Sequence, residues 1–393
     1  MEKIRSFPFK GALFVSYGAM LFEGAMNIII AALMISLAGE YAVLPSQISA
    51  LVAAKSFGSF TMLYLSGALS DKYGRKPVIA IGALLLTLFT GGLIVSTSFY
   101  MMMVFAFIGG LGHGLMDAPS MTILFDMFPG NAAPAVSLVQ VFFSTGGVLV
   151  TSLTAFCLYQ GFSWRYLVFA FLVFGIILMI VTLRSYYPTP VGDIAEQGYQ
   201  PFREEPTLKK EGMMIASCIL LYATFQCVIY TWLPTYMMSA KGFSEASGLN
   251  TLSLFQAGSV LGAIVLAQVM RRVHPSVVMY ANPACSFVLL FILLFTQNAT
   301  LVYGLCFFIG FFYSIIFSLC INMGGELFAR HAGAATGAIG SGNIIGNALV
   351  NLITGKLVLT VSIESIYFAC LIVLALLTLA GLRLRKRYVY LIS

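Results

Sequence analysis

Twelve apolar stretches, separated by short polar breaks, dominate this sequence. A helix that crosses the hydrocarbon core of a bilayer needs about 20 predominantly apolar residues, and each stretch is long enough. The composition agrees, because 60% of the 393 residues are hydrophobic and only 9% are charged, against about 25% in soluble domains. We therefore predict an all-α polytopic membrane protein with 12 transmembrane helices. The predicted spans are residues 10–38, 46–70, 77–97, 99–126, 133–158, 164–184, 212–238, 246–270, 276–296, 299–327, 333–358 and 363–383.

One long polar break divides these spans into two groups of six. It covers residues 185–211 and carries eight charged side chains. We predict an N-terminal six-helix bundle over residues 1–184, a cytoplasmic linker over 185–211 and a C-terminal six-helix bundle over 212–393. Two similar six-span halves are typical of transporters that rock about a central site.

The distribution of Lys and Arg predicts the orientation in the membrane. With the N-terminus in the cytoplasm, all of the 21 Lys and Arg residues except Lys55, Arg165, Lys241 and Lys356 lie on the cytoplasmic side, as the positive-inside rule requires. Both termini are then cytoplasmic, and we expect a multi-pass protein of the cytoplasmic (inner) membrane. The net charge of +7 resides in short loops, so we expect the lipid bilayer as partner and no nucleic acid.

Two further features narrow the class of protein. None of the seven cysteines forms a C-x-x-C pair, which argues against disulfides and structural zinc, so we expect no metal site. The first residues lead directly into the first span without a small-residue cleavage site, so we expect that span to be retained.

The two halves repeat at a constant shift of 200 residues. Acids and glycines carry the match, since any two apolar segments resemble each other. The matched pairs include Gly58 with Gly258, Gly110 with Gly310, Asp126 with Glu326 and Gly146 with Gly346. Such internal duplication again favours a transporter.

The most charged short loop, residues 67–76, reads GALSDKYGRK. It resembles the signature between spans 2 and 3 of the major facilitator superfamily, G-x-L-x-D-R/K-x-G-R-R/K, at every position. With the span count and the repeat, the resemblance covers essentially the whole chain. It implies the superfamily's fold of two pseudo-symmetric six-helix bundles, and a monomer.

The resemblance also implies a cytoplasmic gate that holds the two halves together. Gly74 permits a tight turn, Asp71 faces the N-terminus of span 11, and Arg75 reaches Asp126. The second half lacks the signature, and Arg271 or Arg272 would pair with Glu326 there. The simpler alternative is a plain topology anchor. The predicted gate residues are Gly67, Asp71, Gly74, Arg75, Lys76, Asp126 and Glu326.

Ionisable side chains at membrane depth are costly and usually functional. Glu23 lies 13 residues beyond Lys10, about 20 Å along a helix, with Asn27 one turn further on the same face. His113 and Asp117 share a face of span 4, and Lys55 lies about 15 Å below the outer edge. A desolvated carboxyl group can exchange protons near neutral pH.

We therefore predict proton coupling, with Asp117 as the principal proton site and His113 as its modulator. Glu23 is either a second proton site or a substrate ligand. Alternatively, Lys55 pairs with Glu23 or Asp117 as a structural ion pair, and His113 bonds a backbone carbonyl. We expect no cofactor beyond a proton gradient as driving force.

Family resemblance further implies that spans 1, 4, 7 and 10 line a central cavity. Amide, hydroxyl and aromatic groups there suit a small polar solute. The predicted substrate-binding residues are Glu23, Asn27, Lys55, His113, Gln226, Tyr230, Tyr313 and Asn322. Asn343, Asn347 and Asn351 form a stripe on span 11 that favours interhelical hydrogen bonds over substrate contact.

Two stretches resemble the fucose and related sugar:proton symporters. They are residues 110–117, GLGHGLMD, and residues 230–236, YTWLPTY. We predict a secondary active transporter that moves a sugar, sugar acid or related metabolite. A lone Lys55 in the cavity would instead fit an anionic solute.

The alternative of the same fold is a proton-coupled drug or metabolite efflux antiporter. Residues 144–151, STGGVLVT, lack the proline of the span-5 motif that drug antiporters often show. No catalytic motif or phosphate-binding loop argues for an enzyme.

Overall fold

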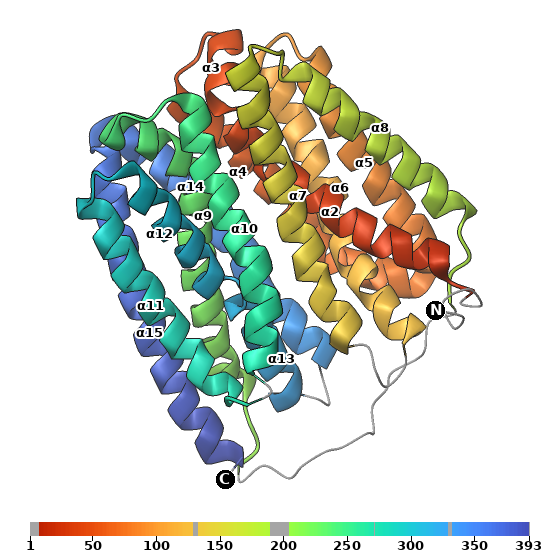
Figure 1. The fold of residues 1–393 in the computed structure, drawn as a ribbon. Coiled ribbons are helices and arrows are strands. Elements are labelled where there is room, and N and C mark those ends of the chain that lie inside the picture. The colour runs from red at the N-terminus through yellow and green to blue at the C-terminus, as the bar shows by residue number, and fades with distance from the viewer. Residues whose placement is uncertain (1–7, 129–132, 189–203, 271, 329–331, 393) are drawn as a thin grey trace. The chain divides into compact units, whose positions relative to one another are not determined.

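A computed structural model of the chain describes residues 8–128, 133–188, 204–270, 272–328 and 332–392, and every regular element among them is a helix (Figure 1). Two compact units emerge, Met1–Asp193 and Ile194–Ser393. The predicted linker, residues 185–211, contains the boundary between these units. Residues 189–203 of that linker lie outside the described part of the chain.

The first unit contains seven described helices, and their neighbours in space follow from the apolar faces of each. The helices are α2 (Lys10–Ala32), α3 (Met34–Tyr41), α4 (Pro45–Tyr73), α5 (Arg75–Val95), α6 (Phe99–Met127), α7 (Ala133–Gln160) and α8 (Arg165–Arg184). Helix α4 packs on α6, α2 on α7, and α5 on both α6 and α8. Gly74 joins α4 directly to α5 with φ of 88°, a left-handed conformation that favours glycine. The tight turn expected there is present.

The second unit begins with a short π-helical turn, η1 (Leu208–Gly212). Its α-helices among the described residues are α9 (Met213–Lys241), α10 (Glu245–Val269), α11 (Pro275–Phe295), α12 (Ala299–Tyr313), α13 (Ile316–Leu327), α14 (Ala332–Thr360) and α15 (Ile363–Ile392). Helix α10 packs on α12, α9 on α14, and α11 on both α12 and α15. Each of these pairs corresponds to a pair in the first unit, because α9, α10, α11, α12, α14 and α15 take the places of α2, α4, α5, α6, α7 and α8.

Close contacts between backbones repeat at the predicted shift of 200 residues. A Cβ atom on Gly110 would lie 1.9 Å from the carbonyl oxygen of Lys55, and one on Gly310 would lie 1.9 Å from that of Phe255. Gly58 and Gly258 likewise face the carbonyl oxygens of Phe107 and Phe307, at 2.3 Å and 1.9 Å from the Cβ position. Small residues let membrane helices approach this closely. The matched glycines therefore hold equivalent helix crossings in the two units.

Two of the predicted spans are each divided into two helices. Residues 10–38 were expected to form one helix, but α2 ends at Ala32 and α3 begins at Met34. Residues 299–327 divide at Ser314 and Ile315, where the Ser314 hydroxyl donates to the carbonyl oxygen of Phe311 at 2.9 Å. A hydroxyl that bonds a nearby carbonyl offers the backbone an alternative to the regular helix ladder.

Ten helices in the described residues are long and apolar enough to cross a membrane. The prediction was twelve. Helix α4 has 29 residues but falls outside the ten, and it carries Lys55, Asp71 and Lys72. Helix α14 also has 29 residues, and within it a shorter apolar stretch, Leu349–Val358, is found. Both are long enough to span a bilayer, at about 1.5 Å per residue.

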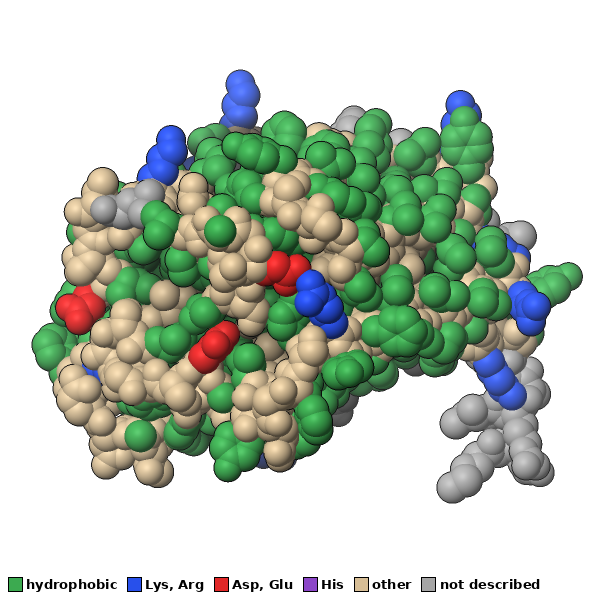
Figure 2. All heavy atoms as spheres, turned by 90° about the horizontal axis from the view of Figure 1, so that it is seen from above, with side chains coloured by type: hydrophobic (Ala, Val, Ile, Leu, Met, Phe, Trp, Pro, Cys, Tyr) green, Lys and Arg blue, Asp and Glu red, His purple; other side chains and the backbone are tan. Residues whose placement is uncertain are grey.

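The outer surfaces of the helices are apolar. Large hydrophobic side chains stand exposed along them, including Phe57 at 58%, Phe291 at 48% and Ile372 at 64% exposed. Figure 2 views the molecule from above, and hydrophobic side chains are widespread there among scattered charged ones. Exposure of such a large apolar surface to water is unfavourable, whereas contact with lipid acyl chains is not. The chain is a multi-pass membrane protein.

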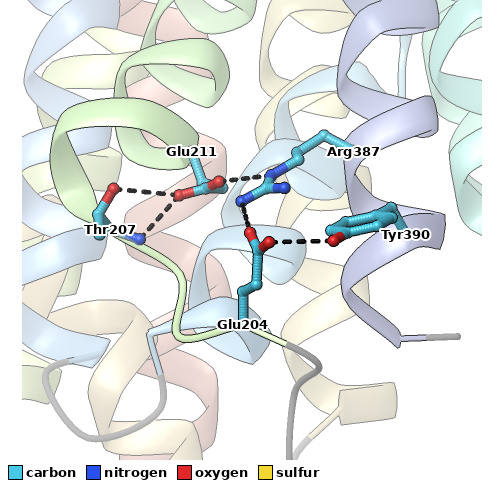
Figure 3. A network of polar contacts seen from close by, with 5 residues as sticks. All are labelled: Glu204, Thr207, Glu211, Arg387 and Tyr390. Atoms are coloured by element: carbon cyan, nitrogen blue, oxygen red, sulfur yellow. Dashed lines mark hydrogen bonds and ion pairs between the residues drawn. The ribbon is translucent and has the colours of Figure 1, made fainter.

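A cluster of polar side chains ties the start of the second unit to its last helix (Figure 3). Arg387 on α15 donates from Nη2 to Glu204 and from Nε to Glu211, both at 2.7 Å. Tyr390 donates to Glu204 at 3.0 Å, and the Thr207 backbone donates to Glu211 at 2.7 Å. One guanidinium thus anchors both the segment before η1 and η1 itself.

This cluster predicts a pH-dependent contribution to stability. The hydrogen bond from Arg387 holds the pKa of Glu204 below its ordinary value of 4.5. A lowered pKa in the folded state means that the contribution is present above pH 4.5 and is lost as pH falls through the folded-state pKa. We expect Glu204→Gln to melt below the wild type at pH 7, and the difference to disappear below pH 4.5. A difference in melting temperature between Glu204→Gln and the wild type that stays constant from pH 7 to below pH 4.5 would contradict this prediction. The exposed Glu364→Gln is the matched control.

Candidate functional site

A group of ionisable side chains lies inside the first unit, on three helices. Glu23 comes from α2, Lys55 from α4, and His113 and Asp117 from α6. Glu23 is 0% exposed and Lys55 is 4% exposed, whereas His113 and Asp117 are half-buried. Ionisable groups are rarely so buried unless they pair or function. We call these four residues the buried charge cluster.

Glu23 has the most unusual surroundings in the cluster. Neither of its carboxylate oxygens has a hydrogen-bond partner among the described residues, and the charged groups that face it are Asp117 and Lys55. Next to it, a Cβ on Gly24 would lie 1.8 Å from the carbonyl oxygen of Phe143, so α2 and α7 touch and exclude water on that side. An unpaired buried carboxylate is costly, which indicates that protonation or a ligand satisfies it.

The ammonium group of Lys55 makes one hydrogen bond in the described part of the chain, from Nζ to Oδ1 of Asn27 at 3.4 Å. Asn27 lies one helical turn beyond Glu23. The alternative expectation, a structural ion pair from Lys55 to Glu23 or Asp117, is wrong, because no such pair lies within 4.0 Å among the described residues. The ammonium group therefore has unused donors.

His113 and Asp117 lie one turn apart on α6, as their spacing predicts. Nδ1 of His113 is buried without a hydrogen-bond partner among the described residues, so the alternative, a hydrogen bond to a backbone carbonyl, is not found at that atom. Pro119 follows within the helix, and the carbonyl of the adjacent Ser120 accepts from Ser16 on α2 at 2.6 Å. This contact fixes α6 against α2, next to the cluster.

A second charged site lies at the junction of α4, α5 and α6, where the sequence predicts a gate. Arg75 Nε donates to Oδ2 of Asp126 at 3.1 Å, and the two side chains are 10% and 5% exposed. Arg75 also donates to the Ser70 hydroxyl, and Lys76 donates to the Ser185 carbonyl at 3.2 Å. The side chains of Asp71 and Glu326 lie outside the described residues.

The buried Arg75–Asp126 pair predicts a large loss of stability when it is broken. Arg75→Met leaves Asp126 buried with fewer partners, and such truncations cost about 3 kcal/mol or more. We expect a lower thermal midpoint, with part of the loss recovered in the Arg75→Met/Asp126→Asn double variant. Thermal unfolding of the three proteins in one detergent tests this. Equal midpoints for Arg75→Met and the wild type would refute it.

The second unit contains a buried network of amide and phenol groups. Gln226 on α9 donates to the hydroxyls of Tyr222 at 3.0 Å and Tyr230 at 3.2 Å. Tyr230 in turn donates to Gln256 on α10 at 3.1 Å. The Tyr313 ring stacks on Tyr222 with centroids 4.4 Å apart. The predicted candidates Gln226, Tyr230 and Tyr313 are thus brought together.

One member of this network, Gln256, was not predicted from the sequence. Gln256 is 0% exposed, and its Nε2 has no hydrogen-bond partner among the described residues. An amide within an apolar span two residues before the repeated Gly258 was the signal that could have identified it. Asn322 on α13, another predicted substrate-binding residue, is exposed.

One side chain of the asparagine stripe of α14 makes the expected hydrogen bond between helices. Asn351 accepts from the Thr231 hydroxyl of α9 at 2.8 Å, and Asn347 bonds Asn343 within α14. The neighbouring Trp232 donates to Thr354 at 2.9 Å. Asn351 and Thr354 thus join α14 to α9 by hydrogen bonds between side chains, a contact that is common between membrane helices.

Two repeated helical units with unpaired ionisable groups at membrane depth define a membrane transport protein. The model of the Major Facilitator Superfamily matches residues 15–349, and this chain belongs to that superfamily. An uncharacterised MFS-type transporter of Bacillus subtilis (strain 168), YfkL, is 28% identical over 348 residues, 87% of each chain.

Solved structures of the same fold include two transporters of known name. A D-xylose-proton symporter has a TM-score of 0.76 at 16% identity, covering 95% of this chain and 96% of its own. The nucleoside transporter NupG has a TM-score of 0.75 at 13% identity, covering 95% and 100%. Membership of this family identifies a transporter rather than an enzyme.

Proposed function

We propose that this protein is a proton-coupled secondary transporter of a small polar solute, such as a sugar or sugar acid. The observation that carries the proposal is Glu23, which is fully buried at membrane depth with both carboxylate oxygens unpartnered. A carboxyl group in this position can be neutral when protonated and must find a counter-charge when it is not. Asp117 and Lys55 face it.

The assignment of solute rests on a different set of residues. The Tyr222–Gln226–Tyr230–Gln256 network offers donors, acceptors and aromatic faces in the second unit, which suit a hydroxylated solute. The fold is shared with a D-xylose-proton symporter, and that resemblance supports the same class of cargo.

The setting of the protein in the cell follows from its charges. We place it in the cytoplasmic membrane with both termini in the cytoplasm, working as a monomer. In that orientation the Arg75–Asp126 pair, with Gly67, Asp71 and Gly74 beside it, forms the cytoplasmic gate.

Transport in proteoliposomes tests this function. We expect counterflow with members of a panel of sugars and sugar acids, and uphill uptake when the lumen is made alkaline. A protonophore should abolish the uphill component and leave counterflow intact. Exchange of lipophilic cations but not of polar solutes would instead identify an efflux antiporter. Solute uptake that ignores the pH gradient would overturn proton coupling.

A further inference from the structure

The ammonium group of Lys55 has too few partners for its position. Lysine carries three N–H donors, yet the described residues supply one acceptor, Oδ1 of Asn27 at 3.4 Å. The residue is 4% exposed, so bulk water does not fill the other two positions. A buried cation with unused donors is a site for an anion.

The backbone fixes Lys55 in this position. The carbonyl oxygen of Lys55 faces Gly110 across the crossing of α4 and α6, at 1.9 Å from where a Cβ would lie. Ten residues separate Lys55 from Pro45 at the start of α4, about 15 Å along the helix. Helix α4 therefore cannot slide or rotate to bring the ammonium to a membrane surface, and its charge must be balanced inside.

The cluster offers two ways to balance that charge. The charged and titratable groups that face Lys55 are Glu23 on α2 and His113 on α6, and Asp117 faces Glu23. When Glu23 is ionised, its carboxylate can neutralise Lys55 from beyond 4 Å. When Glu23 takes up a proton, Lys55 becomes the unbalanced charge of the cluster.

We propose, building on the proposed function, that the transported solute carries a carboxylate group, which binds Lys55 and Asn27 in the first unit as a proton binds Glu23. Before loading, Lys55⁺ and Glu23⁻ sum to zero. After loading, Lys55⁺ and the solute carboxylate sum to zero, and Glu23 is neutral. One proton and one monoanion enter together, so the cluster with its cargo keeps the same net charge throughout.

Pairs of solutes that differ only in charge test this inference. Full-length protein in proteoliposomes is assayed for counterflow of D-glucuronate against D-glucuronamide, D-gluconate against D-gluconamide, and nicotinate against nicotinamide, with D-xylose and D-glucose as neutral sugars. We expect at least one carboxylate to exchange, and its amide to exchange about tenfold more slowly or less, since a charge-assisted bond is lost.

Variants of Lys55 and an electrical measurement complete the test. Lys55→Met should reduce carboxylate exchange by about tenfold or more, and Lys55→Arg should retain more of it than Lys55→Met. Lys356→Met, which removes an exposed charge in the second unit, should leave exchange unchanged. Uptake of the carboxylate driven by a pH gradient should not respond to an imposed potassium diffusion potential, because the step is electroneutral.

The possible failures are distinguishable. Equal exchange of amides and carboxylates, exchange of neutral sugars alone, or potential-driven carboxylate uptake would overturn the anion inference and leave a proton-coupled transporter standing. If neither sugars nor any member of the pairs exchange, the proposed function fails as well.

Discussion

Asp117→Asn is expected to abolish uphill accumulation while counterflow of the same solute continues. Asparagine keeps the shape of the side chain on α6 but cannot bind a proton and pass it to Glu23, the carboxyl group that faces it and that is neutral in the loaded state. With one proton per solute, a pH difference of one unit supports about tenfold accumulation in the wild type. The variant should approach an equal concentration on both sides, a ratio of about 1.

The measurement is uptake of the solute identified by counterflow, in proteoliposomes with an alkaline lumen. Counterflow in the same vesicles shows that the variant still folds and alternates. Glu364→Gln is the matched control, because it removes one carboxylate from an exposed position on α15. It should accumulate solute as the wild type does.

The variant Glu23→Gln shows which of the two carboxyl groups, Glu23 or Asp117, is the principal proton site. If Asp117→Asn still accumulates tenfold and Glu23→Gln does not, the principal proton site is Glu23 and the assignment of Asp117 is wrong. If both variants lose accumulation, the two carboxyl groups act together, as expected for acids that face each other and titrate as a pair.

Much of the fold was predictable because helical spans and small-residue contacts are local properties of the sequence. The hydrophobic stretches gave the helices, and the constant shift of 200 residues predicted that Gly58 and Gly110 would be matched by Gly258 and Gly310. The structure shows all four at equivalent backbone crossings. The breaks at Leu33 and Ser314 were not predictable, since neither Gly nor Pro marks them.

The sequence predicted how deep in the membrane the candidate site residues lie. It did not predict which of these side chains contact one another. Counting residues along each helix places Glu23, Lys55 and Asp117 near the same level of the membrane. It leaves open how each helix is rotated about its axis, and rotation decides which side chains meet. For this reason the Lys55–Asn27 contact and the hydrogen bond between Tyr230 and Gln256 emerge only from the packed structure.

Gly110→Ala is expected to cause one of the largest losses of stability among glycine-to-alanine changes in the first unit. The added Cβ would lie 1.9 Å from the Lys55 carbonyl oxygen and 2.9 Å from the Cα of Gly58. Both obstacles are backbone atoms, which no change of rotamer can move. Overpacking that displaces the backbone costs about 3 kcal/mol or more, and we expect a thermal midpoint lower by roughly 6 °C or more.

The repeat supplies a second copy of this test and a control. Gly310→Ala should destabilise the second unit in the same way, because its Cβ would lie 1.9 Å from the Phe255 carbonyl oxygen. Gly304→Ala, on the same helix with no atom within 4 Å of its Cβ position, should leave the midpoint unchanged. Equal midpoints for Gly110→Ala and Gly304→Ala would contradict the prediction.

The consequences of the two glycine variants for transport should nevertheless differ. In the first unit the carbonyl that faces Gly110 belongs to Lys55, so separating α4 from α6 also displaces the ammonium group from Asn27. In the second unit the equivalent carbonyl belongs to Phe255, an apolar residue without a part in the proposed charge exchange. Among protein that remains folded, Gly110→Ala should therefore slow counterflow of the carboxylate more than counterflow of a neutral solute. Gly310→Ala displaces Phe255, which precedes Gln256 of the proposed solute network and packs on Tyr230, so it should slow both solutes alike. An equal effect of Gly110→Ala on the two solutes would indicate that the position of Lys55 does not limit transport of the carboxylate.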